Sequence, residues 1–302
     1  MILNPHAKLL WHGDRVKDWL EGNPINPILV EIAPTGYCNA SCPWCFFKSK
    51  LGSERIDTQT MLRTLSELAV AGAKAINWTG GGEPTLHPDF EKFVERAAQV
   101  GLKQGLFTNA LKEIPCQEHF EWIRVSMTDK GYPAMKKPYC PFGINVNHTE
   151  SQTEAELRAL CLEARNMGAS YFQIRPALVG CFKIQPHLKP LQYLHEYDTA
   201  DFSVYTTEYK YADCILDREY SKCYGFNFCP SINWKNKLGV CLYMMEDERF
   251  ILGDLKEQSF SGIWSEAPSF VNVVPECQNC CKNHEINKIL FTAKNIQQIE
   301  FL

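Results

Sequence analysis

The sequence lacks the features that mark several large classes of protein. It contains no uninterrupted apolar run of the roughly 18 residues that a membrane helix needs, and no repetitive stretch typical of disordered or collagen-like chains. The first twenty residues turn polar too early for a secretory signal peptide. We therefore expect a soluble, cytoplasmic protein without a membrane partner.

Positive charge is also scarce. The 302 residues include 31 Lys and Arg against 35 Asp and Glu, which gives a net charge of −4. A nucleic-acid-binding domain normally carries a basic patch or stripe, so we expect no nucleic-acid partner. With 45% hydrophobic residues the chain is long enough to bury one large core or two smaller ones.

Cysteine, by contrast, is abundant. The chain has 14 cysteines, and without a secretory signal their clustering favours metal binding over disulfides. One dense group spans Cys38–Cys45 and a second spans residues 214–281. The other four are scattered, and we expect them to be small buried apolar side chains: Cys116, Cys140, Cys161 and Cys181.

Short apolar runs alternate with amphipathic segments between about residues 28 and 180. Three of the amphipathic segments have helical periodicity, with Asp57 and Pro88 as expected starts and glycines as expected ends. Such alternation predicts an α/β fold of parallel strands, and six units predict a partial (β/α)6 TIM-like barrel. The expected strands are Ile28–Pro34, Ile76–Thr79, Leu102–Thr108, Trp122–Met127, Phe142–His148 and Tyr171–Leu178.

The alternation weakens after about residue 200. A strand is expected within residues 202–211, and a hairpin within 231–243 that turns at Lys235–Lys237. Because this region has its own cysteines, we predict a small C-terminal metal-binding domain. The expected division is an N-terminal extension over residues 1–27, the partial barrel over 28–200 and the small domain over 201–302.

The first cysteine group has the spacing Cys38-x3-Cys42-x2-Cys45 and directly follows the first expected strand. Three thiolates on one short loop suit three corners of a four-iron cluster. No histidine lies between His12 and His87 to complete the ligand set, which also counts against a zinc knuckle. One iron therefore stays open, as a catalytic metal site requires.

At these residues the chain resembles the radical S-adenosylmethionine (SAM) superfamily, whose hallmark is CxxxCxxC after the first barrel strand. Trp44 fills the aromatic position before the third cysteine. Further along, Gly80–Pro84 resembles the family's GGE segment, Thr108–Ala110 its T-N-G turn and Ile123–Ser126 its fourth strand. Thr128 stands where the family often has Asp, so we expect a substrate contact to differ there.

The resemblance implies that Cys38, Cys42 and Cys45 hold a [4Fe–4S] cluster whose open iron binds SAM. One electron, from a donor such as flavodoxin or ferredoxin, would then release a 5′-deoxyadenosyl radical that removes hydrogen from a substrate. Expected SAM contacts are Gly81 and Gly82 through close backbone approach, Glu83 to the ammonium, and Ser126 and Arg175 to the ribose and the carboxylate. Trp44 and Phe46 are expected near the adenine, and Asn109 is a further expected SAM contact.

The second group resembles the auxiliary-cluster extension of many radical SAM enzymes. Cys277-x2-Cys280 has a metal-type spacing, and the longer form of the extension, SPASM, needs more cysteines than follow here. The shorter form, Twitch, therefore fits better, and the small domain is expected to hold a second [4Fe–4S] cluster. We choose Cys223, Cys241, Cys277 and Cys280 as ligands, with Cys229 a rival for Cys223 and a structural zinc site as the alternative.

The resemblance also suggests a reaction class. Relatives with one extra cluster often act on sugar-like or aminocyclitol molecules, so we expect a small polar substrate that is oxidised or epimerised. One alternative is peptide modification by a maturase of ribosomally made peptides, although only 27 residues precede the first strand, too few for the usual peptide-binding domain. A non-catalytic metal-binding protein is the alternative of another class.

Overall fold

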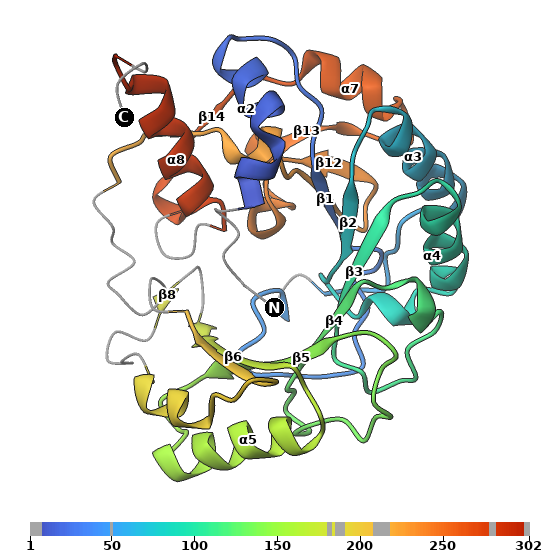
Figure 1. The fold of residues 1–302 in the computed structure, drawn as a ribbon. Coiled ribbons are helices and arrows are strands. Elements are labelled where there is room, and N and C mark those ends of the chain that lie inside the picture. The colour runs from blue at the N-terminus through green and yellow to red at the C-terminus, as the bar shows by residue number, and fades with distance from the viewer. Residues whose placement is uncertain are drawn as a thin grey trace.

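The structure is a computed structural model that describes residues 8–48, 51–179, 183–184, 191–207, 218–277 and 282–298. Its centre is a strongly curved sheet with helices around the outside (Figure 1). Ten strands form this sheet in the order β13-β12-β11-β1-β2-β3-β4-β5-β6-β9. No helix in these ranges has both the length and the apolar character needed to cross a membrane.

The first six strands run parallel and lie side by side in chain order. Each lies within or one residue beyond a run predicted from the sequence, so the predicted partial barrel is confirmed. A seventh parallel strand, β9 (Ser203–Thr206), pairs with β6 where the sequence predicted a strand. The six are β1 (Leu29–Ile32), β2 (Ala75–Trp78), β3 (Lys103–Thr108), β4 (Trp122–Ser126), β5 (Phe142–His148) and β6 (Tyr171–Pro176).

Three long helices cover the outer face of the sheet (Figure 1): α3 (Thr58–Val70), α4 (Phe90–Gln99) and α5 (Glu154–Asn166). The predicted helix ends hold, since Gly72, Gly101 and Gly168 follow the three helices with positive φ. The start of α4 differs from the prediction by two residues. Pro88 lies outside the helix because the N–H of Asp89 bonds to His87 Nδ1 at 3.1 Å, which fixes a turn there.

The hydrophobic core fills the space between the sheet and these helices. Ile32, Ile76, Trp78 and Ile144 are fully buried there. Because successive strand residues point to opposite faces, the alternate positions face the concave side of the sheet. Those positions are largely polar, which gives the barrel a polar interior.

The C-terminal region continues the same sheet. β11 (Ser231–Ile232) pairs parallel with β1, and β12 (Lys237–Gly239) and β13 (Ile251–Asp254) follow antiparallel. The predicted hairpin is therefore confirmed, but its first strand extends the barrel sheet at the β1 edge. The division of the chain into three parts stays a prediction.

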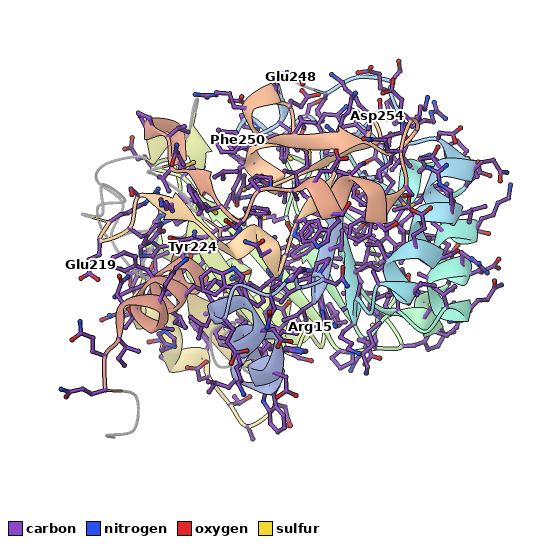
Figure 2. All side chains as sticks on the ribbon, turned by 90° about the horizontal axis from the view of Figure 1, so that it is seen from above. Arg15, Glu219, Tyr224, Glu248, Phe250 and Asp254 are labelled. Atoms are coloured by element: carbon purple, nitrogen blue, oxygen red, sulfur yellow. The ribbon has the colours of Figure 1, made fainter. Side chains whose placement is uncertain are left out.

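Shorter elements connect and flank these strands. Arg15 lies on the N-terminal helix α2 (Figure 2). It donates to the carbonyls of Asn26, Pro27 and Gly72 and so ties that helix to the barrel. The helices are α2 (Gly13–Leu20), α7 (Phe260–Glu266) and α8 (His284–Asn295), and the short strands are β7 (Leu178–Val179), β8 (Lys183–Ile184), β10 (Lys222–Cys223) and β14 (Val271–Asn272). The 3₁₀ helices are η1 (Leu10–His12), η3 (Pro84–Leu86), η4 (Gln117–His119), η5 (Gln192–Tyr197), η6 (Gly225–Asn227), η7 (Leu242–Met244), η8 (Glu248–Phe250) and η9 (Pro275–Cys277).

The turn of the β11–β12 hairpin generates a prediction about stability. Asn236 has a left-handed backbone with φ of 64°, and its Oδ1 accepts the Asp57 N–H at 2.8 Å, at the start of α3. Asn236→Ala should lower the free energy of unfolding by about 2–3 kcal/mol, because it loses this bond and strains the backbone. Asn236→Gly loses only the bond and should cost roughly 1–2 kcal/mol less in denaturant titrations. Equal losses would contradict the backbone argument.

Candidate functional site

The first cysteine group lies on the loop between β1 and α3, at the carboxyl end of the first strand. Cys38, Cys42 and Cys45 are each half-buried, and the Cys45 N–H donates to the Cys42 carbonyl at 3.1 Å. Burial raises the pKa of all three thiols, that of Cys42 to about 11. Charge on Cys45 raises the pKa of Cys38 and Cys42 further, so the three thiols are electrostatic neighbours.

The chemistry of this loop fits an iron–sulfur cluster, because thiolates are its usual ligands and three of them share one short loop. In the described part of the chain, no three Cys, His, Asp or Glu side chains lie close enough together to form a site for a single metal ion. The assignment of the three thiols as cluster ligands therefore stays a prediction.

A second loop, after β4, contacts the cysteine loop. Asp129 Oδ1 accepts a hydrogen bond from Cys42 Sγ at 3.5 Å and another from the Ser41 N–H at 3.2 Å. Lys130 Nζ donates to the Asn39 carbonyl at 3.0 Å. In the sequence, Thr128 stands where the radical SAM family often has Asp. The next residue, Asp129, supplies a carboxylate at the cysteine loop. Sequence reasoning missed it because the partners are 87 residues apart.

Glu83 is buried at the start of η3 and accepts four hydrogen bonds. The donors are the N–H and hydroxyl of Thr85, the Thr108 hydroxyl at 2.6 Å and the Asn109 N–H at 2.7 Å. Asn109 Nδ2 in turn lies 3.7 Å from Cys38 Sγ. Burial raises the pKa of Glu83, whereas these hydrogen bonds act to lower that pKa. Glu83 and Asn109 thus hold the turn after β3 against the cysteine loop, and their predicted contacts with SAM stay predictions.

The glycines before Glu83 are packed against protein. A Cβ on Gly81 would lie 2.1 Å from the Trp234 ring, and one on Gly82 would lie 1.9 Å from the Tyr37 carbonyl oxygen. The sequence predicted these glycines for close approach of a cofactor; the structure shows that protein contacts alone already require them. Trp234 is fully buried and also packs against Phe47 of the cysteine loop. Sequence reasoning assigned no role to this tryptophan.

The remaining predicted SAM contacts lie at the mouth of the barrel or close to it. Ser126 is the last residue of β4, and Arg175, near the end of β6, donates to Asn147 Oδ1 at 3.1 Å. Trp44 is half-buried and packs against the main hydrophobic core. Their roles toward SAM stay predictions.

Two amide side chains inside the barrel were missed. Asn145 on β5 is in register with Ser126 on one side and with Gln173 of β6 on the other. Asn145 is 2% exposed, and among the described residues neither of its amide atoms nor Gln173 Oε1 has a hydrogen-bond partner. A buried polar atom without a partner costs roughly 1–3 kcal/mol, which a ligand can recover. The signal was visible as polar residues at alternate positions of two buried strands.

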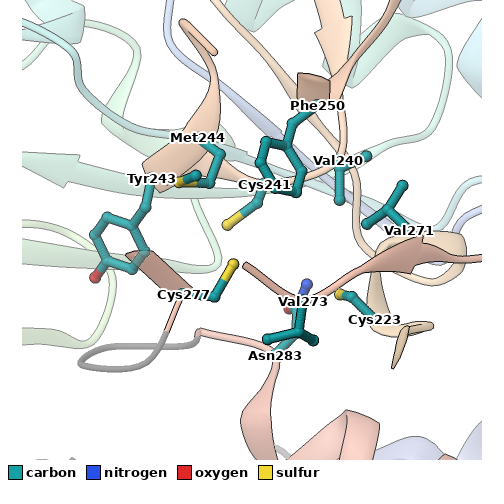
Figure 3. A pocket seen from close by; sticks show the side chains of 10 residues that line it. All are labelled: Cys223, Val240, Cys241, Tyr243, Met244, Phe250, Val271, Val273, Cys277 and Asn283. Carbon is teal, nitrogen blue, oxygen red and sulfur yellow. The ribbon is translucent and has the colours of Figure 1, made fainter. Parts of the chain in front are cut away.

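Three cysteines of the second group line one small cavity. Cys223 of β10, Cys241 before η7 and Cys277 at the end of η9 contribute their thiols to it (Figure 3). Apolar side chains such as Val240 and Phe250 form most of the remaining wall. Three of the four predicted auxiliary ligands therefore share one cavity. The fourth, Cys280, lies outside the described residues, as does Cys181 of the scattered set.

Cys229, the rival of Cys223, is outside this cavity. It is buried beside Lys282, whose Nζ lies 3.3 Å from its sulfur and forms an ion pair with Glu31 of β1. Of the two, Cys223 alone lines the cavity, and the choice between them as auxiliary ligand stays a prediction. Among the scattered cysteines, Cys161 is fully buried, while Cys116 and Cys140 are half-buried against the main core.

Part of the chain matches a known protein family. Residues 32–134, which hold the three cysteines and the glycine-rich turn, match the Radical SAM superfamily. The match covers about a third of the chain, and this part is similar to the radical SAM superfamily. Similarity to that superfamily implies one [4Fe–4S] cluster and SAM as cofactors.

Two curated proteins each match part of the chain. PqqA peptide cyclase of Methylorubrum extorquens is 35% identical over 95 residues, which are 28% of this chain and 24% of the relative. The 7-carboxy-7-deazaguanine synthase of Haemophilus influenzae is 33% identical over 82 residues, 27% of this chain and 36% of the relative. The chain thus spans about a quarter of the length of the peptide cyclase it matches.

Solved structures share the fold over most of the chain. SuiB of Streptococcus suis with bound S-adenosylmethionine gives a TM-score of 0.62 at 18% identity, covering 89% of this chain and 72% of that one. The structure of anSMEcpe with bound AdoMet and Cp18Cys peptide gives 0.57 at 18% identity, with 87% and 88% covered. At these identities the likeness concerns the fold.

The contact between Gly81 and Trp234 generates a prediction. Gly81→Ala should lower the free energy of unfolding by about 2–3 kcal/mol, because the added methyl group overlaps the fully buried ring of Trp234. Gly52→Ala is the matched control, since nothing lies within 4 Å of its added Cβ. Denaturant titration of the metal-free protein measures both, and equal stabilities would show that the Trp234 contact is not tight.

Proposed function

We propose that this radical SAM enzyme modifies a peptide. The observation that carries the proposal is the 35% identity to PqqA peptide cyclase, a relative named for a peptide substrate. The polar barrel interior supports it, because a peptide bond offers one hydrogen-bond donor and one acceptor side by side. Asn145 and Gln173 present amide groups of the same kind on adjacent strands, with atoms that lack partners among the described residues.

The residues of the cysteine loop would hold the catalytic cofactors. Cys38, Cys42 and Cys45 would bind three irons of a [4Fe–4S] cluster and leave one for SAM, and together these groups supply a 5′-deoxyadenosyl radical. Asp129 and Lys130 would brace the loop from the far side of the barrel mouth. The remaining expected contacts with SAM are the backbone at Gly81 and Gly82, and the side chains of Glu83, Asn109, Ser126, Arg175 and Trp44.

A second [4Fe–4S] cluster is proposed in the cavity lined by Cys223, Cys241 and Cys277, with Cys280 as the fourth ligand. Oxidation of a substrate radical releases one electron and one proton, and a cluster near the barrel is a suitable acceptor for the electron. The external one-electron donor, of the flavodoxin or ferredoxin type, would serve the first cluster. A zinc ion on the same thiolates is the alternative for this cavity.

A small polar substrate is the second candidate. The similarity to 7-carboxy-7-deazaguanine synthase supports it, because that relative is named for a product that is not a peptide. The sugar-like or aminocyclitol substrate expected from the sequence belongs to this candidate. The similarity to the peptide cyclase is higher in identity and longer in residues, so the peptide reading is the one we favour.

The test combines SAM cleavage with transfer of a labelled hydrogen. Anaerobically reconstituted and reduced protein should release 5′-deoxyadenosine from SAM. Cys42→Ala should abolish this, while Cys116→Ala, a change outside both cysteine groups, should retain it. Short peptides encoded beside the gene, made with deuterated residues, should pass deuterium to 5′-deoxyadenosine and lose mass themselves.

Two results would contradict the proposal in different ways. Wild-type protein with its full iron content that releases no 5′-deoxyadenosine would contradict the radical SAM activity. Release without deuterium transfer from any such peptide, but with transfer from a deuterated sugar or aminocyclitol, would favour the small-molecule candidate.

A further inference from the structure

The amino end of α8 lies beside the auxiliary cavity, where one buried asparagine lines the wall and a second contacts the thiol of Cys223. Asn287 is fully buried in the first turns of the helix. Its Oδ1 accepts the N–H groups of Tyr224 and Gly225, both at 2.7 Å. Its Nδ2 lies 3.3 Å from Cys223 Sγ. Because two backbone donors occupy the oxygen, the orientation of the amide is fixed, and the nitrogen must face the sulfur.

Asn283, the N-cap residue of α8, lies on the wall of the same cavity. It is 2% exposed, and its Oδ1 has no hydrogen-bond partner among the described residues. Figure 3 shows its amide nitrogen turned toward the space between Cys223 and Cys277. Gly225 leaves room for this side chain, since a Cβ at that position would lie 2.7 Å from Asn283 Cβ. The amide is therefore built into the cavity wall.

Two cationic side chains lie near the thiols: the charge of Lys282 interacts with Cys241, and Arg218 donates to the Cys277 carbonyl. Neither of them lines the cavity. Its remaining described lining consists of apolar side chains, Tyr243 and the three thiols, with no cationic residue among them. The amino end of a twelve-residue helix adds a partial positive charge directed at the same place. Hydrogen bonds to cluster sulfurs, together with solvent exposure and net charge, set the reduction potential of an iron–sulfur centre.

We propose that Asn287, assisted by Asn283, donates hydrogen bonds to the sulfurs of the auxiliary centre and raises its reduction potential, so that it accepts an electron from the substrate radical. The inference rests on the proposed second cluster and goes beyond it, because it names the side chains that set the reduction potential of that cluster. Asn287 is a positioning residue that acts through Cys223. The substrate radical gives one electron to the auxiliary centre. It releases one proton to solvent in the same oxidation.

The test is Asn287→Asp in the reconstituted holoenzyme. Aspartate keeps an oxygen for the N–H groups of Tyr224 and Gly225 but cannot donate to the sulfur. We expect the iron content to stay the same and the equilibrium constant for one-electron reduction of the auxiliary cluster to fall about tenfold, which is ~59 mV. Redox titration followed by electron paramagnetic resonance measures this, and the potential of the SAM-binding cluster should not move.

Asn295→Asp is the matched control, because it adds the same charge at the exposed far end of the same helix. Its auxiliary potential should equal that of the wild type. If Asn287→Asp keeps its iron and its auxiliary potential is unchanged, or if Asn295→Asp shifts the potential equally, the proposal is overturned.

A third variant covers the case in which Asn287→Asp loses the auxiliary iron. Asn283→Asp leaves the Asn287 bonds in place, and it should also shift the auxiliary potential downward; an unchanged potential in this variant would then overturn the proposal. Wild-type protein that shows one cluster and one bound zinc ion would instead contradict the proposed second cluster itself. The two failures are therefore distinguishable by metal content.

Discussion

Trp234 lies where three segments of the chain meet. It lies two residues after β11, and its ring fills the space left by Gly81 in the turn before η3. The ring also packs against Gly36 and Phe47 of the cysteine loop. The ring is fully buried, so none of the three segments can shift without opening a cavity or forcing a clash. The loop that carries the first cysteine group is thus held by the C-terminal part of the chain as well as by its own strand.

The parallel pairing of β11 with β1 gives this contact its rigidity and links the two cysteine groups. β1 leads into the first group, and the segment after β11 contains Cys241 of the second. The ion pair between Lys282 and Glu31 adds a second connection between the C-terminal segment and β1. Both cysteine groups are therefore connected to β1.

Local sequence signals predicted much of the fold. The apolar runs located the six parallel strands, and Asp57 caps α3 by accepting the Thr60 N–H, as its position predicted. Contacts between distant segments were not predictable in this way: Cys223 and Cys229 both precede the hairpin, but only Cys223 lines the cavity. The Trp234 contact depends on pairing between β1 and β11, about 200 residues apart, for which a single sequence carries no signal. The polar positions of β5 and β6 did carry a signal, since alternate residues in a buried strand need a reason to be polar.

The metal content of the anaerobically reconstituted chain tests the account most directly. Two cysteine groups that each hold a four-iron cluster predict about eight irons per chain and no zinc, with two separable cluster signals in electron paramagnetic resonance. About four irons with one zinc ion would contradict this, because the second cysteine group would then hold a redox-inactive ion and have no part in electron transfer.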